Sequence, residues 1–303
     1  CLASSVYATK TRFLPTITYY SQRTMMRCVF LIACSSTALE FTVPARDGYK
    51  LSVITSKTAK TDDAVLLLHG RTWSSGPVWQ TTGAIDTLGR AAYGMDFRGF
   101  GRTQTRAADG LLRPSTCVDD VCDVLADLRT KHENVHLLGW SYGGLVAQRV
   151  AASTDLVDRL VLYSSVWDET GDYADDNGRF KAPVPRGPQT LEDCASDFNL
   201  PGSISAEDSD AFARAALAAD PQCVDWTALS EFAVDLGDVK CPCLVIHGDQ
   251  DPYASRETQR SLYDALGSSA KEMVVIDGSD HVAHALTQPK VQWAGAIGAF
   301  LDA

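Results

Sequence analysis

Residues 135–152 read VHLLGWSYGGLVAQRVAA, and this stretch decides the fold. It begins with an apolar run, continues through Gly139-Trp-Ser-Tyr-Gly143, and becomes a helical pattern from about Gly144. A strand-to-helix turn this tight forces the serine into a strained backbone conformation, and side chains in place of the two glycines would clash with the neighbouring strand or helix. A bare G-x-S-x-G match is a weak signal. The strand before it and the helix after it favour Ser141 as a nucleophile over an incidental serine in a glycine-rich turn.

Apolar runs alternate with helical patterns along the rest of the chain. Residues 39–43 and 49–55 alternate apolar and polar side chains, which predicts an antiparallel hairpin. Continuous apolar runs, typical of strands buried on both faces, follow at 64–68, 91–95, 135–138, 159–163, 243–246 and 273–276. Helical patterns lie at 115–131 (with Ser115 as the expected N-cap), 145–152, 256–266 and 291–301. We therefore expect an α/β fold with a mostly parallel eight-stranded sheet and helices on both faces.

Two segments fall outside this alternation. Residues 166–235 contain no buried strand and are too long for a plain loop, so they predict a helical insertion, with a helix over 206–219 capped by Ser205. Residues 1–37 form a basic leader without Asp or Glu. It is a transit peptide for a plastid or mitochondrion, a short secretory signal if translation starts at Met25 or Met26, or an upstream extension of the protein. Without such a leader the protein would be cytoplasmic. The expected core is 38–165 with 236–303.

Composition excludes several classes of function. The 303 residues carry a formal net charge of -11, which argues against nucleic acid as a partner because phosphate binding needs a basic surface. The apolar run at 28–34 is too short to span a bilayer. The nine cysteines show no zinc-like spacing, although Cys194 and Cys223 could form a disulfide in a secreted protein. No nucleotide-binding motif is present, so we expect neither a cofactor nor a metal.

A serine nucleophile needs a base to take its proton and an acid to orient that base. In this strand–turn–helix context the base is expected late in the chain, and the acid after a strand between the two. His247-Gly-Asp-Gln-Asp251-Pro follows the apolar run at 243–246, and Asp277-Gly-Ser-Asp-His281 follows the run at 273–276. The order Ser141, Asp251, His281 fits this expectation.

These segments resemble the α/β-hydrolase superfamily from about Leu39 to the end of the chain. The resemblance rests on Leu67-Leu-His-Gly70, Asp96-Phe-Arg-Gly-Phe-Gly101, Gly139 to Gly143, and His247 to Pro252 with Gly278 to His281. It implies that Asp251 is the acid, that Asp249 is a turn residue, and that His281 is the base. It also implies that residues 166–235 form a cap over the active site, and that the backbone N–H groups of Tyr142 and Arg71 form an oxyanion hole.

Alternatives stay open at several of these positions. Asp168, just after the run at 159–163, is a second candidate acid, because some relatives place the acid there. His281 and His284 have the spacing of a metal pair, but no H-E-x-x-H pattern accompanies them, and His284 is expected in a helix beside the site. His69 is expected to be structural. Arg71 departs from the small or apolar residue of relatives, and its side chain either meets an acidic substrate or points to solvent. Apolar residues of the insertion either line an acyl pocket or pack it against the core; they are Phe198, Leu200, Phe212, Leu217, Trp226 and Phe232.

The expected function is hydrolysis of a small-molecule ester or acyl substrate through an acyl-enzyme on Ser141. The same three residues also serve C–C bond hydrolysis, perhydrolysis and acyl transfer, and the sequence does not separate these reactions. Epoxide hydrolases and haloalkane dehalogenases are disfavoured, because such relatives carry Asp where Ser141 stands. A non-catalytic receptor on the same fold is a further alternative.

Overall fold

A computed structural model describes residues 39–57, 62–103, 111–167, 188–196, 198, 200–222, 225–226 and 234–303. These residues belong to one contact unit that spans 38–303. The leader predicted over 1–37 lies outside the described residues.

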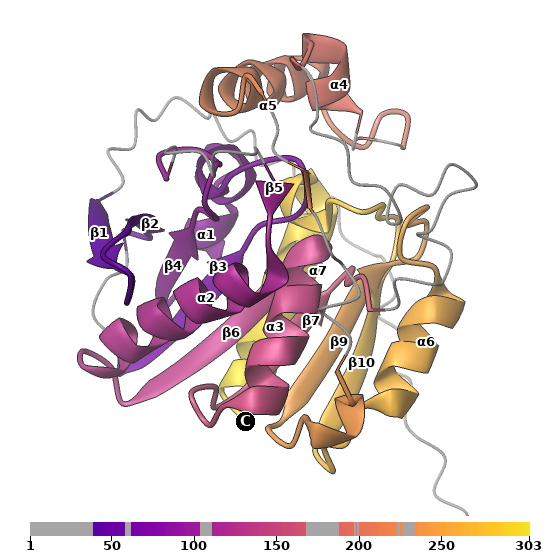
Figure 1. Ribbon diagram of the computed structural model, residues 1–303. Helices are drawn as coiled ribbons and strands as arrows, with labels where there is room; N and C mark the ends of the chain where they lie inside the picture. The colour runs from indigo at the N-terminus through magenta and orange to yellow at the C-terminus, as the bar shows by residue number, and fades with distance from the viewer. Residues whose placement is uncertain are drawn as a thin grey trace, which may run out of the picture. The chain divides into compact units, whose positions relative to one another are not determined.

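Eight strands form one sheet in the order β1-β2-β4-β3-β6-β7-β9-β10 (Figure 1). The β1–β2 and β2–β4 pairs are antiparallel, and every other neighbouring pair is parallel. This arrangement confirms the predicted α/β fold with a mostly parallel eight-stranded sheet. The strands are β1 (Glu40–Pro44), β2 (Lys50–Thr55), β3 (Asp63–Leu68), β4 (Ala91–Met95), β6 (Asn134–Trp140), β7 (Leu160–Tyr163), β9 (Cys243–Gly248) and β10 (Lys271–Ile276).

Each face of the sheet has its own apolar core, because successive side chains of a strand point to opposite faces. In β3, Leu66 and Leu68 belong to one core, whereas Val65 and Leu67 belong to the other. The first core includes buried residues of α2 (Pro114–Arg129), α3 (Tyr142–Ser153) and α6 (Arg256–Ala265). The second includes α1 (Ala84–Thr87), α7 (Thr287–Leu301) and the π-helix η1 (Gly76–Thr81). Helices therefore cover both faces, as predicted.

Three helices begin earlier than their apolar periodicity indicates. α3 begins at Tyr142 rather than at about residue 145. The N-cap of α2 is Arg113 rather than Ser115, so that prediction was wrong. Pro114 at the first helical position explains the difference, because its fixed φ suits a helix start and its missing N–H needs no partner there. α7 begins at Thr287 instead of Val291, and Pro289 lies in its first turn, where proline is tolerated.

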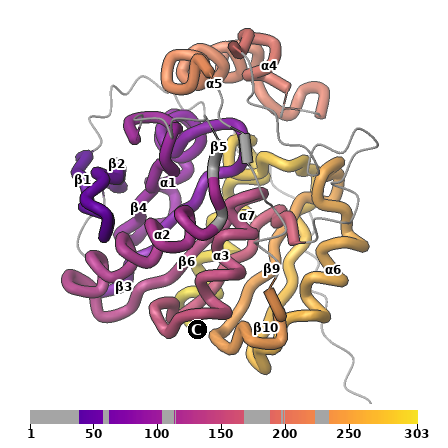
Figure 2. The backbone as a smooth tube through the Cα atoms, viewed as in Figure 1, coloured from indigo at the N-terminus to yellow at the C-terminus, as the bar shows by residue number. Residues whose placement is uncertain are grey.

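Between β7 and β9 the chain forms α4 (Leu191–Ala195) and α5 (Ala206–Ala219), which lie side by side (Figure 2). The predicted helix over 206–219 and its Ser205 cap are both present, since the Ser205 hydroxyl accepts a hydrogen bond from the Asp208 N–H. A two-stranded parallel sheet of β5 (Leu111–Leu112) and β8 (Asp225–Trp226) was not predicted. Among the described residues, no helix has both the length and the apolarity needed to cross a membrane.

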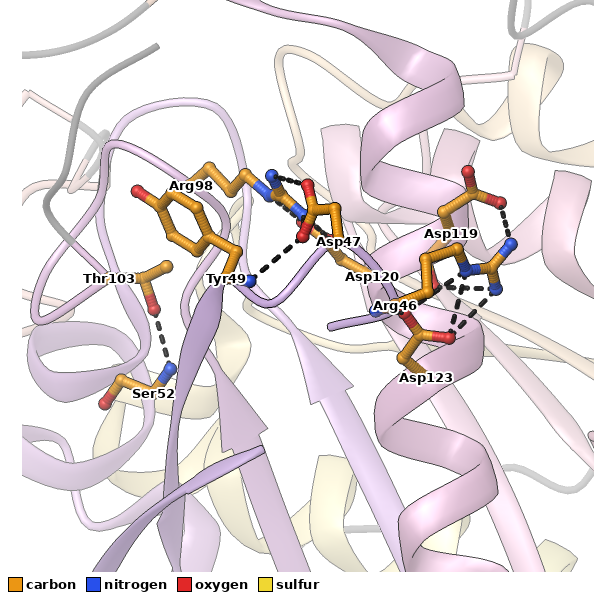
Figure 3. Close-up of polar contacts among 9 residues, drawn as sticks. All are labelled: Arg46, Asp47, Tyr49, Ser52, Arg98, Thr103, Asp119, Asp120 and Asp123. Atoms are coloured by element: carbon orange, nitrogen blue, oxygen red, sulfur yellow. Dashed lines mark hydrogen bonds and ion pairs between the residues drawn. The ribbon is translucent and has the colours of Figure 1, made fainter. Parts of the chain in front are cut away.

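Two arginines connect the β1–β2 turn with α2 (Figure 3). Their side chains differ in burial, with 15% of Arg98 and 54% of Arg46 exposed. The Arg98 guanidinium donates to Asp120, whose side chain is 2% exposed, and also to Asp47 in the turn. Arg46 donates to Asp119 and Asp123 from a side chain that is 54% exposed. The Arg98–Asp120 ion pair is therefore largely removed from water, whereas the ion pairs of Arg46 lie at the surface.

We predict that Arg98→Ala lowers the free energy of unfolding by about 3 kcal/mol, because it leaves the Asp120 carboxylate buried without its charge partner. Arg46→Ala is the matched control, and its effect should stay within about 1 kcal/mol because exposed pairs contribute little. Chemical denaturation of both variants measures the difference. Equal losses would show that burial does not decide the strength of these pairs.

Candidate active site

The residues singled out in the sequence follow the carboxyl ends of neighbouring strands. Arg71 follows β3, Ser141 follows β6, Asp251 follows β9 and His281 follows β10. β6 pairs with β3, and β10 pairs with β9. Because parallel strands end at the same edge of a sheet, these four segments meet where ligands bind in open α/β folds.

Ser141 has the strained conformation that the tight turn requires. Its φ of 53° and ψ of -119° lie in a region that residues with a side chain rarely occupy. The backbone around it holds this geometry. Ser141 N–H donates to Tyr163 O at 3.0 Å, and Ser141 O accepts from Gly144 N and Val166 N at 2.9 and 3.1 Å. The serine is 8% exposed.

Glycines around Ser141 allow the close approach of neighbouring backbone. A Cβ on Gly139 would lie 2.5 Å from Gly143 O, and one on Gly143 would lie 2.6 Å from His69 O. Both obstacles are backbone atoms, which cannot rotate away. The glycines are therefore required by packing between β6, α3 and the loop after β3.

Gly143→Ala should lower the free energy of unfolding by about 3 kcal/mol or more, since the added methyl group forces backbone apart. Gly295→Ala in α7 is the matched control, because no atom lies within 4 Å of a Cβ there. The free energy of unfolding of that variant should rise by about 0.5–1 kcal/mol, because alanine has a higher helix propensity than glycine. Thermal or urea unfolding compares the two, and similar effects would contradict the packing argument.

Asp251 and His281 form a buried pair. His281 Nδ1 lies 2.9 and 3.1 Å from the two carboxylate oxygens of Asp251, and the residues are 4% and 7% exposed, respectively. Asp251 Oδ1 also accepts the N–H groups of Tyr253 and Ala254. Burial alone would raise the pKa of Asp251, but the charge and hydrogen bond of His281 and the Ala254 N–H outweigh it and lower the pKa. An ionised carboxylate only accepts, so Nδ1 of His281 carries a proton.

Two aromatic side chains fix the backbone of His281. Trp140 Nε1 and the Tyr163 hydroxyl both donate to His281 O, at 3.0 and 3.2 Å. The Trp140 ring also lies 5.3 Å from the His281 ring, centroid to centroid. Since Trp140 directly precedes Ser141, one residue of β6 connects the serine with the histidine. The sequence offered no signal for this role.

The loop after β3 packs directly on Ser141. A Cβ on Gly70 would lie 3.3 Å from Ser141 Cβ, so the backbone next to Arg71 lies against the serine. His69 Nε2 accepts the Phe97 N–H, and burial lowers the pKa of His69 to about 3, which favours a neutral ring that holds the backbone. The Arg71 guanidinium lies over the Tyr142 ring, 5.5 Å from its centroid.

Two buried carboxylates accept hydrogen bonds from Ser74 and Ser75 in the loop after β3. Asp96 accepts the N–H groups of Ser75 and Arg102, and burial raises its pKa to about 7. Asp220 accepts the N–H and hydroxyl of Ser74 and the N–H of Gly101. Asp220 carries no recognisable sequence signal, because an acidic residue at the end of a helix does not indicate contact with a loop 146 residues away.

The other residues singled out in the sequence are His284, the apolar residues of the insertion and Asp168. His284 lies in a 3-10 helix (Ala283–Ala285), buried beside Tyr163, whose hydroxyl is 3.1 Å from its Nδ1. In the described part of the chain, no group of three or more His, Cys, Asp or Glu side chains could hold a metal ion. Phe212 packs edge to face on Trp73 and Phe198, so its contacts are those of a docking residue. Asp168, Cys223, Phe232 and the side chain of Trp226 lie outside the described residues.

Known proteins place the chain in a family. The sequence matches the model of the Alpha/beta hydrolase family over residues 65–296, well over half of the chain. The chain therefore belongs to the α/β-hydrolase family, which confirms the resemblance stated above. Among curated proteins, no sequence matches it.

Solved structures with a similar fold carry different activities in their names. An esterase from Rhodococcus sp. ECU1013 is 17% identical over 87% of this chain and 98% of its own, with a TM-score of 0.65. A bromoperoxidase from Bacillus anthracis is 18% identical over 88% and 100%, with a TM-score of 0.63. A meta-cleavage product hydrolase from Pseudomonas fluorescens IP01 is 16% identical over 86% and 97%, with a TM-score of 0.64. At these identities the likeness concerns the fold alone.

Proposed function

We propose that this protein is a serine hydrolase that cleaves carboxylic esters through an acyl-enzyme on Ser141. The observation that carries the proposal is the buried Asp251–His281 hydrogen bond at the sheet edge where Ser141 has its strained conformation. A hydroxyl is a weak nucleophile at neutral pH, and an oriented imidazole is the group that activates it.

In the proposed reaction, Ser141 Oγ attacks the acyl carbonyl while His281 Nε2 takes the hydroxyl proton. Asp251 stabilises the resulting imidazolium through Nδ1–H and keeps the ring oriented. The N–H groups of Tyr142 and Arg71 donate to the oxyanion. His281 then returns the proton to the leaving alcohol, and water activated by the same nitrogen cleaves the acyl-enzyme.

The proposal includes a cap at residues 166–235 and a core made of 38–165 and 236–303. Support for the cap comes from α5, which packs on η1, and from the T-shaped contact of Phe212 with Trp73 just beyond Arg71. Because α5 packs beside the loop that carries Arg71, it is positioned to contact the acyl group of a substrate. The substrate is then a small ester with an acyl chain that the cap can cover.

We predict that the full chain hydrolyses p-nitrophenyl esters within the series from acetate to palmitate, and that Ser141→Ala lowers kcat/KM by about 10⁴-fold or more. Initial rates from p-nitrophenolate absorbance measure both. Labelling of Ser141 by a fluorophosphonate without ester turnover would favour the alternatives with the same nucleophile, such as C–C hydrolysis, perhydrolysis or acyl transfer. The absence of both labelling and turnover would favour a non-catalytic ligand-binding protein.

Two acidic residues of one turn provide a sharper test of the acid. Asp251→Asn should lower kcat by about 10⁴-fold, because an amide cannot stabilise the imidazolium and can select the wrong His281 tautomer. Asp249→Asn is the matched control: it keeps an oxygen that can accept the Ser279 N–H and should retain activity within about threefold. If Asp249→Asn is the more damaging of the two, the assignment of the acid is wrong.

A further inference from the structure

Asp220 ends α5 with an unusual set of contacts. Its side chain is buried, with the residue 2% exposed. One carboxylate oxygen accepts the Ser74 N–H and hydroxyl at 2.9 and 2.7 Å, and the other accepts the Gly101 N–H at 2.7 Å. All three donors belong to loops of the core, and none belongs to the segment that carries Asp220.

Helix stability does not account for an aspartate at this position. Asp220 is the C-cap of α5, and a negative charge at a helix C-terminus opposes the helix dipole. Burial of a carboxylate is also unfavourable unless hydrogen bonds satisfy it. The hydrogen bonds from Ser74 and Gly101 offset part of that penalty, although burial still raises the pKa of Asp220, so the carboxylate fits these two loops rather than its own helix.

The loop that Asp220 holds is the one that meets the nucleophile. Ser74 lies three residues beyond Arg71, the proposed oxyanion donor, and Gly70 packs against Ser141 Cβ. The neighbouring Ser75 N–H is held by Asp96 in the same way. A shift of Ser74 would therefore pass along a short, constrained piece of backbone to the Arg71 N–H.

A second contact connects the same segment with the proposed base. Leu200 N–H, between α4 and α5, donates to Asp280 at 3.3 Å, and Asp280 directly precedes His281. Phe212 of α5 adds its contact with Trp73, with ring centroids 6.3 Å apart. Residues 200–220 thus contact both the loop that carries Arg71 (residues 69–75, called the oxyanion loop) and the loop that carries His281.

We propose that Asp220 is a positioning residue that couples the α4–α5 segment to the oxyanion loop, so that seating of the segment fixes the Arg71 N–H for catalysis. This inference rests on the proposed function. Asp220 touches neither substrate nor reacting atoms, and it acts through Ser74.

The test is Asp220→Asn in the full chain, with Asp210→Asn as matched control. Asn has the same size, but its NH₂ group replaces one of the two acceptor oxygens. Asp210, on the same helix, is exposed and pairs with Arg214, so its substitution makes the same change of charge without touching the core. Titration of Ser141 with a fluorophosphonate corrects all rates for the fraction of active protein.

The decisive readout is the ratio of kcat for a p-nitrophenyl ester to kcat for the matching thionoester. Sulfur accepts hydrogen bonds poorly and fits an oxyanion hole badly, so only the ester reaction depends strongly on the hole. Asp220→Asn should lower the ester kcat and this ratio by about tenfold, with KM within about threefold, whereas Asp210→Asn should change neither. A partly unfolded variant would lower both rates equally. An unchanged ratio would overturn the proposal.

Hydrogen exchange separates this proposal from the proposed function. Amides of residues 69–76 should exchange about tenfold faster in Asp220→Asn than in the wild type or in Asp210→Asn. If the wild type hydrolyses no ester, the proposed function fails while this measurement still tests the coupling. Unchanged exchange in Asp220→Asn would overturn the coupling whatever the activity.

Discussion

The structure depends on a turn that brings β6, Ser141 and α3 together with no room for side chains at the flanking glycines. A serine with φ of 53° persists only where its surroundings determine it. Here the strand β7 supplies the acceptor for its N–H, and Gly144 and Val166 supply donors for its carbonyl. The same close packing brings the backbone of His69 against Gly143, so the loop after β3 is positioned by the turn as well.

The turn also holds His281, the proposed base, through the residue that precedes Ser141. Trp140 fills the position before Ser141, and its indole donates to the carbonyl of His281. The proposed acid and base follow two strands that are adjacent in the sheet, which brings Asp251 within hydrogen-bonding distance of His281 although 30 residues separate them. Sheet order sets which side chains meet, the hydrogen bonds from Trp140 and Tyr163 hold the backbone of His281, and Asp251 holds its ring.

Local patterns explain why the sequence predicted so much of this arrangement. Apolar runs and glycine positions reflect short-range geometry, so the sheet, the helix over 206–219 and the segments of the site could be predicted. Helix starts at Pro114 and Thr287 were missed because the residues there are polar or prolyl and carry no periodic signal. Asp220 and Asp280 were missed for another reason. Their contacts join segments 80 to 146 residues apart, and no local pattern encodes such a meeting.

The kind of contact at Asp220 matters as much as its location. Apolar packing such as that of Phe212 on Trp73 tolerates small sliding, because apolar burial is not directional. Three donors on two carboxylate oxygens do not, since hydrogen bonds weaken steeply with misalignment. A buried carboxylate moved even slightly would lose compensation for its burial. The α4–α5 segment therefore has one preferred register on the loop after β3, and the proposed oxyanion donors next to Ser141 would be positioned together with that segment.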